Sequence, residues 1–201
     1  MKFYTFISFI FHPVLVPMVA TLLYFIIIPN HIPKEFTYRI LSIVFVTTYI
    51  IPILLLYFLK KVNLIESYQL LSINERKFPI LFFVILSLLL GKLLLKPKTI
   101  DILALSFFGC ALALGIVYIL FISRVKTSLH TLGVSGLIGL ICIISYQYQI
   151  NLLVLLIFLF ILLGIISTSR LKLKAHKMNE IFIGIIVGFF TQIIVYVSYT
   201  F

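Results

Sequence analysis

Seven long apolar runs, separated by short polar segments, constrain the fold of this 201-residue chain more than any other feature. Each run is close to the roughly 20 residues that a helix needs to cross the hydrocarbon core of a bilayer. Lipid offers the backbone no hydrogen-bond partners, and the runs are far too long for barrel strands, so each is predicted to be an α-helix. The runs cover approximately residues 3–28, 38–59, 79–95, 100–123, 129–147, 151–168 and 180–200.

The amino-acid composition agrees with that of an integral membrane protein. Hydrophobic residues make up 63% of the chain and charged residues 10%, whereas soluble domains contain about 45–50% and about 25% respectively. This excludes aqueous enzymes, disulfide scaffolds and disordered tails. Seven spans leave no room for a soluble domain, so we expect one domain over residues 1–201: an all-α integral membrane protein, folded as a compact bundle of six to seven transmembrane helices.

Prolines interrupt the first two runs. Pro13 and Pro17 remove two backbone donors, which predicts a kinked or partly re-entrant first helix, and Pro52 predicts a kink in the second. Between the second and third runs, residues 61–75 mix apolar and polar side chains, which predicts a helix lying in the membrane interface.

Small residues recur four positions apart in two of the later runs. Such pairs allow helices to approach closely, within one chain or between the subunits of a homo- or hetero-oligomer. The pairs are Gly109 with Ala113, Ala111 with Gly115, and Gly184 with Gly188.

Counting membrane crossings places the segments 60–78, 124–128 and 169–179 on the same face as the N-terminus. Of the 16 Lys and Arg residues, 11 then lie on that face: Lys2, Lys60, Lys61, Arg76, Lys77, Arg124, Lys126, Arg170, Lys172, Lys174 and Lys177. The positive-inside rule would make this face cytoplasmic. The same cations, converging with His130 and His176, could instead form a phosphate site. Because these basic residues lie in short loops between membrane spans, their position favours anionic lipid headgroups over nucleic acid as partners.

Residues 169–180, SRLKLKAHKMNE, carry the densest group of reactive side chains. His176 and Glu180 would lie one turn apart at the start of the last helix, where the carboxylate can accept an imidazole N–H and fix the tautomer. The planar guanidinium of Arg170 can donate two parallel hydrogen bonds to phosphate oxygens.

Two further segments on the same face have matching chemistry. Residues 126–130 offer Lys126, two hydroxyls, helix-start amides and His130 at the mouth of the fifth span. Residues 75–79 place Arg76 and Lys77 just before Pro79, which is expected in the first turn of the third span.

In this order, the three segments resemble the type 2 phosphatidic acid phosphatase superfamily, whose motifs are KxxxxxxRP, PSGH and SRxxxxxHxxxD. Here the third motif reads SRxxxxxHxxxE at 169–180 and the second reads TSLH at 127–130, while the first keeps Pro79 and nearby basic residues but lacks the lysine. The resemblance covers residues 74–201 approximately, leaving accessory helices at about 1–60.

The resemblance implies a bacterial inner-membrane phosphatase whose site faces the periplasmic or outer side. His176 would be the nucleophile that forms a phospho-histidine, Glu180 its orienting partner and His130 the general acid. Phosphate would be bound by Arg170, Arg76, Lys77, Ser128 and Lys126. The substrate would be a lipid mono- or pyrophosphate such as undecaprenyl pyrophosphate or phosphatidate. No metal or other cofactor is expected, because Glu66, Glu75 and Glu180 are too scattered along that face to hold Mg²⁺.

Departures from the family pattern leave an alternative open. Glu180 is one methylene longer than aspartate, and Leu129 replaces a glycine that would let phosphate approach the backbone. The chain could therefore be a catalytically weakened relative, serving as a non-enzymatic subunit of a membrane complex or as a lipid-binding protein. His12 would join the motif face if the first helix is kinked, or it could be a structural histidine beside Pro13.

Overall fold

The computed structural model describes residues 2–28, 32–66, 68, 70 and 72–200. This part of the chain is an all-α bundle with seven helical segments long and apolar enough to cross a membrane, and it contains no strand. The protein is therefore a multi-pass membrane protein. In chain order the elements are α1 (Lys2–Ile10), η1 (Pro13–Leu15), α2 (Val16–Ile27), α3 (Lys34–Phe45), the π-helical turn η2 (Val46–Ile50), α4 (Ile51–Lys61), α5 (Ile73–Leu95), η3 (Lys98–Ile100), α6 (Asp101–Ile122), α7 (Leu129–Tyr148), α8 (Leu153–Lys172) and α9 (Met178–Thr200).

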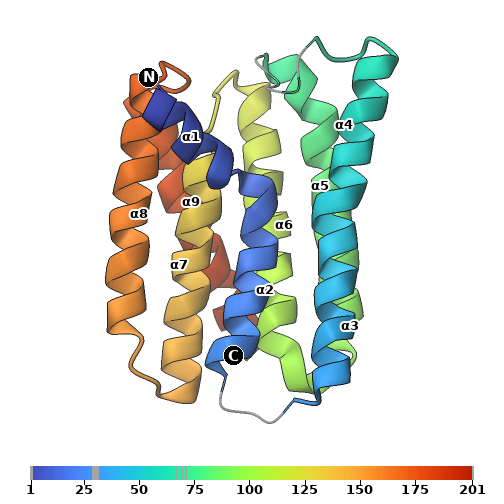
Figure 1. Ribbon diagram of the computed structural model, residues 1–201, viewed down its shortest axis with the longest axis vertical. Coiled ribbons are helices and arrows are strands. Elements are labelled where there is room, and N and C mark those ends of the chain that lie inside the picture. Colours follow the sequence, from blue (N-terminus) through green and yellow to red (C-terminus); the bar gives the residue numbers. More distant parts are fainter. Residues whose placement is uncertain (1, 29–31, 67, 69, 71, 201) are drawn as a thin grey trace.

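The first span is broken where its prolines predict a kink. Helix α1 ends at Ile10, and the His12 side chain then caps η1 by accepting a hydrogen bond from the Val14 backbone N–H. Pro13 begins η1 and Pro17 lies in the first turn of α2, so both occupy positions where a missing donor costs little. As a result α1 lies obliquely across one end of the bundle (Figure 1).

The second span contains the irregularity expected at Pro52. The π-helical turn η2 lies immediately before Pro52 and connects α3 to α4. Pro52 has no backbone N–H, and a π-turn is one of the irregularities by which a helix accommodates such a missing donor.

The third span begins earlier than predicted. Ser72 and Glu75 form a capping box that starts α5 at Ile73, so Pro79 lies inside the helix. The expectation that Pro79 occupies the first turn is wrong, because the reciprocal hydrogen bonds of the cap fix the helix start upstream.

The predicted interfacial helix over 61–75 is also wrong. Between α4 and α5 the described residues form turns, with left-handed backbone at Asn63 and Leu70. Residues 67, 69 and 71 of that segment lie outside the described residues.

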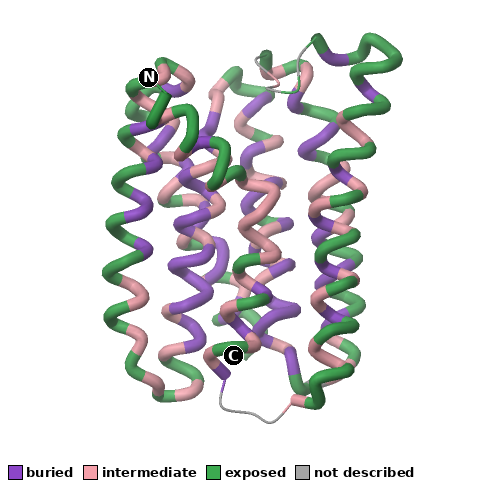
Figure 2. The backbone as a smooth tube through the Cα atoms, in the orientation of Figure 1, coloured by how far each residue is buried: buried purple, intermediate pink, exposed green. Residues whose placement is uncertain are grey.

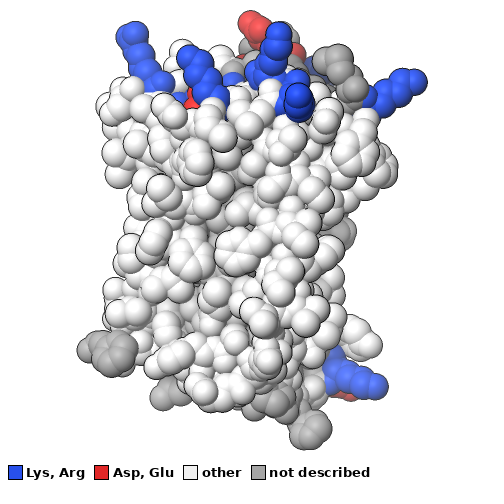
Figure 3. All heavy atoms as spheres, turned by 90° about the vertical axis from the view of Figure 1, so that its left-hand side faces the viewer, with Lys and Arg blue, Asp and Glu red and all other residues white. Residues whose placement is uncertain are grey.

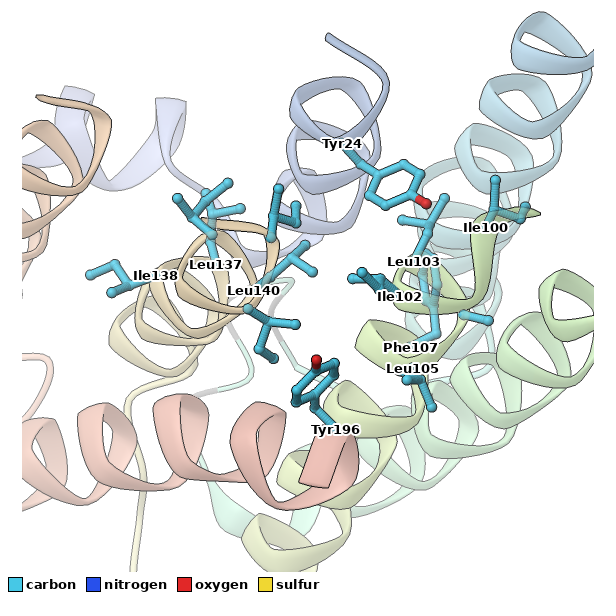
Figure 4. Close-up of a cluster of buried hydrophobic side chains, with 14 of the residues drawn as sticks. Tyr24, Ile100, Ile102, Leu103, Leu105, Phe107, Leu137, Ile138, Leu140 and Tyr196 are labelled. Carbon is cyan, nitrogen blue, oxygen red and sulfur yellow. The ribbon is translucent and has the colours of Figure 1, made fainter. Parts of the chain in front are cut away.

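The core lies around α6 and α7. Helix α7 is buried along most of its length, whereas α8 exposes its outer side (Figure 2). Side chains from α2, α6, α7 and α9, including Tyr24, Phe107, Ile138 and Tyr196, form the main hydrophobic cluster (Figure 4). In a bilayer such packing is driven by close contact between side chains more than by exclusion of water.

Helices α7 and α9 approach closely through small residues. A Cβ atom added to Gly184 would lie 2.6 Å from Thr131 Oγ1, and one added to Gly188 would lie 2.2 Å from the Leu132 carbonyl oxygen. The close contact predicted for these two glycines therefore exists within the chain. Gly115 differs, because a Cβ added there would meet nothing within 4 Å.

The ends of the bundle agree with the crossing count. The N-terminus and the α4–α5, α6–α7 and α8–α9 connections lie at one end (Figure 1). A second view shows most of the visible Lys and Arg side chains at this end (Figure 3). We refer to it below as the basic end.

We predict that Gly188→Ala lowers the melting temperature in detergent by about 5 °C or more, because overpacking costs about 1–3 kcal/mol. The added methyl group would force α7 and α9 apart. Gly115→Ala is the matched control, and it should be neutral or slightly stabilising because alanine is the better helix former. Equal melting temperatures for the two variants would contradict the close contact.

Candidate functional site

The corner between α8 and α9 brings His176 and Glu180 together. Lys174 has a φ of 53°, which turns the chain after α8, and His176 then lies just before α9. The His176 Nδ1 and Glu180 Oε2 atoms are 2.6 Å apart, and the two side chains are 2% and 19% exposed. Because a carboxylate only accepts, Nδ1 carries the proton and Nε2 keeps its lone pair. The contact predicted from the four-residue spacing is confirmed.

Arg170 reaches the same region from the last turn of α8. Its Nη1 donates a hydrogen bond to the Ser8 hydroxyl at 3.3 Å. Its Nε is buried and has no hydrogen-bond partner within the described part of the chain. An unpaired buried donor is costly, so this guanidinium has unused capacity for an acceptor.

Arg76 enters from the first turn of α5 and is buried, unlike its neighbour Lys77, which is exposed. Arg76 Nε donates to the Leu70 carbonyl oxygen at 2.7 Å. Arg76 and Arg170 interact electrostatically with each other and with His176. Of the two adjacent cations in the predicted phosphate set, the structure thus brings only Arg76 toward the other site residues.

The α6–α7 connection is held against the start of α9. Lys126 Nζ donates to the Ala175 carbonyl oxygen at 3.4 Å, and the Ser128 backbone N–H donates to the Glu180 carbonyl oxygen at 3.2 Å. The Ser128 hydroxyl accepts from the Thr131 N–H and caps α7. Ser128 is therefore a buried helix cap, and any phosphate contact would require its hydroxyl proton. The adjacent Thr127 hydroxyl is buried without a partner among the described residues.

His130 lies in the first turn of α7 and is bound by the N-terminal helix. Its Nε2 is 3.0 Å from the Ser8 carbonyl oxygen, so Nε2 carries the proton and donates it. The ring also meets His12 edge-on, with the centroids 5.7 Å apart. The family resemblance implies that His130 gives its proton to the leaving group. In this structure His130 donates that proton to the Ser8 backbone carbonyl.

Sequence reasoning missed Ser8. This residue binds His130 through its carbonyl and Arg170 through its hydroxyl. Its only signal in the sequence is that it is a serine in a mostly apolar segment, and serines of that kind are common at contacts between membrane helices.

The charges of the cluster do not balance. Arg76 and Lys126 each interact electrostatically with one carboxylate, Glu180, whereas Arg170 interacts with the like charge of Arg76, and Glu75 adds a second negative charge near Arg76. Buried cations without an equal number of anions are costly. An anion bound among these side chains would relieve that cost, and a phosphoryl group has the charge and the acceptor oxygens to do so. We call Arg76, Lys126, His130, Arg170, His176 and Glu180 the cationic cluster.

Two groups of the cluster lie outside the membrane-spanning helices, and their proton affinities are shifted. Burial lowers the pKa of His176, and Arg170 and Arg76 lower it further, against the opposing effect of Glu180. Burial also lowers the pKa of Lys126, with Arg76 adding to the effect. Near neutral pH the His176 imidazole is consequently uncharged, which is the form that can act as a nucleophile.

Two hollows of the described surface are lined by residues that are close in sequence to members of the cationic cluster. One is lined by Asn63, Leu64, Glu66, Ser72 and Glu75, and the other lies between α1 and α8. The Ser8 contacts place α1 directly over His130 and Arg170. Among the described residues, no three His, Cys, Asp or Glu side chains are arranged to hold a metal ion.

No protein-family model, curated protein or solved structure matches this chain. The fold and the site nevertheless define a class: a multi-pass all-α membrane protein with a partly buried cationic cluster at its basic end. A more specific assignment depends on the chemistry of that cluster.

We predict that ¹⁵N NMR of histidine-labelled protein in detergent shows His176 titrating below the range of a free imidazole. Arg170→Gln should raise the pKa of His176, because it removes a positive charge that disfavours the imidazolium ion. Lys172→Gln is the control, since this exposed neighbour should leave the titration unchanged. His176→Gln assigns the resonance, and a midpoint at or above the ordinary value would contradict the described electrostatics.

Proposed function

We propose that this chain is a metal-independent lipid-phosphate phosphatase of the bacterial inner membrane, related in mechanism to the type 2 phosphatidic acid phosphatases that its motifs resemble. Its substrate would be a lipid mono- or pyrophosphate such as phosphatidate or undecaprenyl pyrophosphate. One observation carries the proposal: the His176–Glu180 pair lies within the electrostatic reach of Arg76 and Arg170.

The proposed reaction begins with attack by His176 Nε2 on phosphorus. The bond from phosphorus to the leaving oxygen breaks as the N–P bond forms, and the developing imidazolium is stabilised through Nδ1–H by Glu180. Arg76, Arg170 and Lys126 hold the non-bridging oxygens, where negative charge accumulates. Water then attacks the phospho-histidine, which breaks the N–P bond and releases inorganic phosphate.

The leaving oxygen needs a proton, and the resemblance assigns this role to His130. The Nε2–H of His130 must then exchange the Ser8 carbonyl for the leaving oxygen. Because Ser8 also accepts from Arg170, a displacement of α1 would free both side chains at once. Productive binding is therefore coupled to movement of α1 away from the cluster.

The same Ser8–His130 contact favours a second function. If α1 keeps His130 engaged, the cationic cluster binds a phosphoryl group without turning it over. The chain would then be a lipid-phosphate-binding protein or a non-enzymatic subunit of a membrane complex.

We predict that the purified protein releases phosphate from phosphatidic acid or undecaprenyl pyrophosphate in the presence of EDTA. His176→Ala should reduce the rate by about 10³-fold or more, and Arg170→Gln by roughly 10²-fold, because they remove the nucleophile and one oxygen clamp. Lys172→Gln is the matched control on α8 and should retain full activity.

Quenched reactions with ³²P-labelled substrate provide the direct test of the intermediate. An acid-labile, alkali-stable label on the wild-type protein, absent from His176→Ala, supports the mechanism. Unchanged phosphate release from His176→Ala would eliminate it. Saturable binding of phosphatidic acid without release, weakened by Arg170→Gln, would establish the second function instead.

We further propose that the basic end faces the periplasm, as the resemblance implies, because the cluster's own cations contribute to the excess on that face. In a background where Cys110 and Cys142 are alanine, Lys172→Cys should react with a membrane-impermeant thiol reagent in intact cells. Thr99→Cys, at the opposite end, should react only after the membrane is permeabilised. The reverse pattern would make the basic end cytoplasmic, as the positive-inside rule favours.

A further inference from the structure

Two histidines lie at the contacts that hold α1 over the cationic cluster. His130 Nε2 donates to the Ser8 carbonyl oxygen at 3.0 Å, and Arg170 Nη1 donates to the Ser8 hydroxyl at 3.3 Å. His12 lies at the corner between α1 and η1, and its ring meets the His130 ring edge-on. We propose that protonation of His12 and His130 releases α1 and so opens the cationic cluster to a phosphoryl ligand. This inference concerns the regulation of that site, and it rests on the proposed function for the identity of the ligand.

The neutral form of His12 stabilises the corner between α1 and η1. Its Nδ1 accepts a hydrogen bond from the Val14 backbone N–H at 3.4 Å, and this bond caps η1. An imidazole nitrogen accepts only when it carries no proton, so His12 is neutral here, with its proton on Nε2. In the imidazolium form both nitrogens are donors, and the Val14 N–H loses its acceptor. Protonation of His12 therefore weakens the corner that orients α1.

The groups that act electrostatically on the two rings are basic. Arg170 of α8 acts on both rings, and His12 and His176 add to its effect on His130. Glu180 is the carboxylate of the cationic cluster, and its Oε2 is already engaged by His176 Nδ1 at 2.6 Å. A proton bound at His12 or His130 thus adds a positive charge beside Arg170, and like charges disfavour the contact between α1 and the cluster.

Among the described residues, the other elements packed around these rings bring no acidic side chain to this corner. The ionisable side chains of α2 and η2, which both pack on η1, are Tyr24 and Tyr49. Tyrosines stay neutral in the pH range in which histidine titrates. Asp101 begins α6 at the opposite end of the bundle (Figure 1).

The direction of the pH effect follows from these contacts. We call α1 docked when both Ser8 contacts are made, and released when they are broken. Docked α1 is favoured above the pH range in which histidine titrates, and it is lost as the pH falls through that range. Release also frees His130 Nε2–H and Arg170 Nη1, and the added positive charge favours a bound anion. Acidification would therefore open the site and strengthen its hold on a phosphoryl group.

Distances between two spin labels test the movement without any substrate. The labels are attached to Phe9→Cys on α1, where the side chain is 78% exposed, and to Lys172→Cys on α8, in protein carrying Cys110→Ala and Cys142→Ala. In lipid nanodiscs, lowering the pH from about 8 to about 5 should raise the ratio of released to docked α1 by at least about tenfold. A distance distribution that does not change with pH would overturn the proposal.

Histidine variants identify the groups that titrate. His12→Asn keeps an acceptor for the Val14 N–H, because asparagine is a favoured N-cap, but it removes the titrating ring. This variant should weaken the pH response, and its combination with His130→Gln should abolish it. His176→Gln is the matched control, and it should keep the response because His176 pairs with Glu180. A double variant that responds as strongly as the unsubstituted histidines would overturn the assignment to these two rings.

A ligand measurement separates this inference from the proposed catalysis. Dihexanoyl phosphatidic acid, added to spin-labelled His176→Ala protein at pH about 8, should increase the released population, whereas dihexanoyl phosphatidylcholine should not. An unchanged population with the lipid phosphate would overturn the link between α1 and the cluster. A protein that shows both responses but never releases phosphate would support this inference and contradict the proposed catalysis. An active phosphatase whose α1 ignores pH would do the reverse.

Discussion

The close contact between α7 and α9 is the constraint on which the candidate site depends. Gly184 and Gly188 allow the two backbones to meet, and the hydroxyls of Thr131 and Ser135 donate to the Ile181 and Gly184 carbonyls across the contact. Each hydroxyl also donates at 3.1 Å to a carbonyl of its own helix segment, so the interhelical bonds are the longer branches of shared contacts. In lipid the close packing of small residues therefore takes the place of the driving force that water supplies elsewhere. At the basic end the same contact joins the Ser128 N–H to the Glu180 carbonyl. The segment carrying His130 and the segment carrying His176 are therefore fixed together by packing that has no chemical role.

The charges of the cationic cluster are a second constraint on the site. Arg76 and Arg170 come from different helices and repel each other, yet both are directed toward the region of His176. A fold selected for stability alone has little reason to place like charges together in a partly buried region, since a mixture of signs or an apolar contact is less costly. Perturbed titratable groups gathered in this way are typical of sites that handle charge. The cluster keeps His176 neutral and simultaneously offers donors to an anion, which are the two conditions that histidine attack on a phosphoryl group requires.

Local patterns in the sequence predicted much of this, and long-range contacts account for the rest. Apolar runs located the seven spans, the crossing count located the basic end, and the spacing of His176 and Glu180 predicted their contact. The capping box at Ser72 and Glu75 is also a local pattern, and it places Pro79 inside the helix and not in its first turn. Whether Arg76 or Lys77 turns inward depends on helix rotation, which an almost uniformly apolar helix does not reveal. The role of Ser8 depends on a contact 122 residues away in the chain, for which no local pattern exists.

Helix α1 contacts two members of the cationic cluster, His130 and Arg170, through Ser8. The break at His12 and Pro13 ends its helical hydrogen bonding before α2 begins, so α1 is oriented by its own contacts rather than by the span that follows. Those contacts include Ser8 against His130 and Arg170, an edge of the hollow, and packing on α8. Its phenylalanines Phe3, Phe6 and Phe9 are exposed, as expected for a helix held in the membrane interface. Under the proposed function, the break in the first span would let α1 move aside and give a lipid phosphate access to His176.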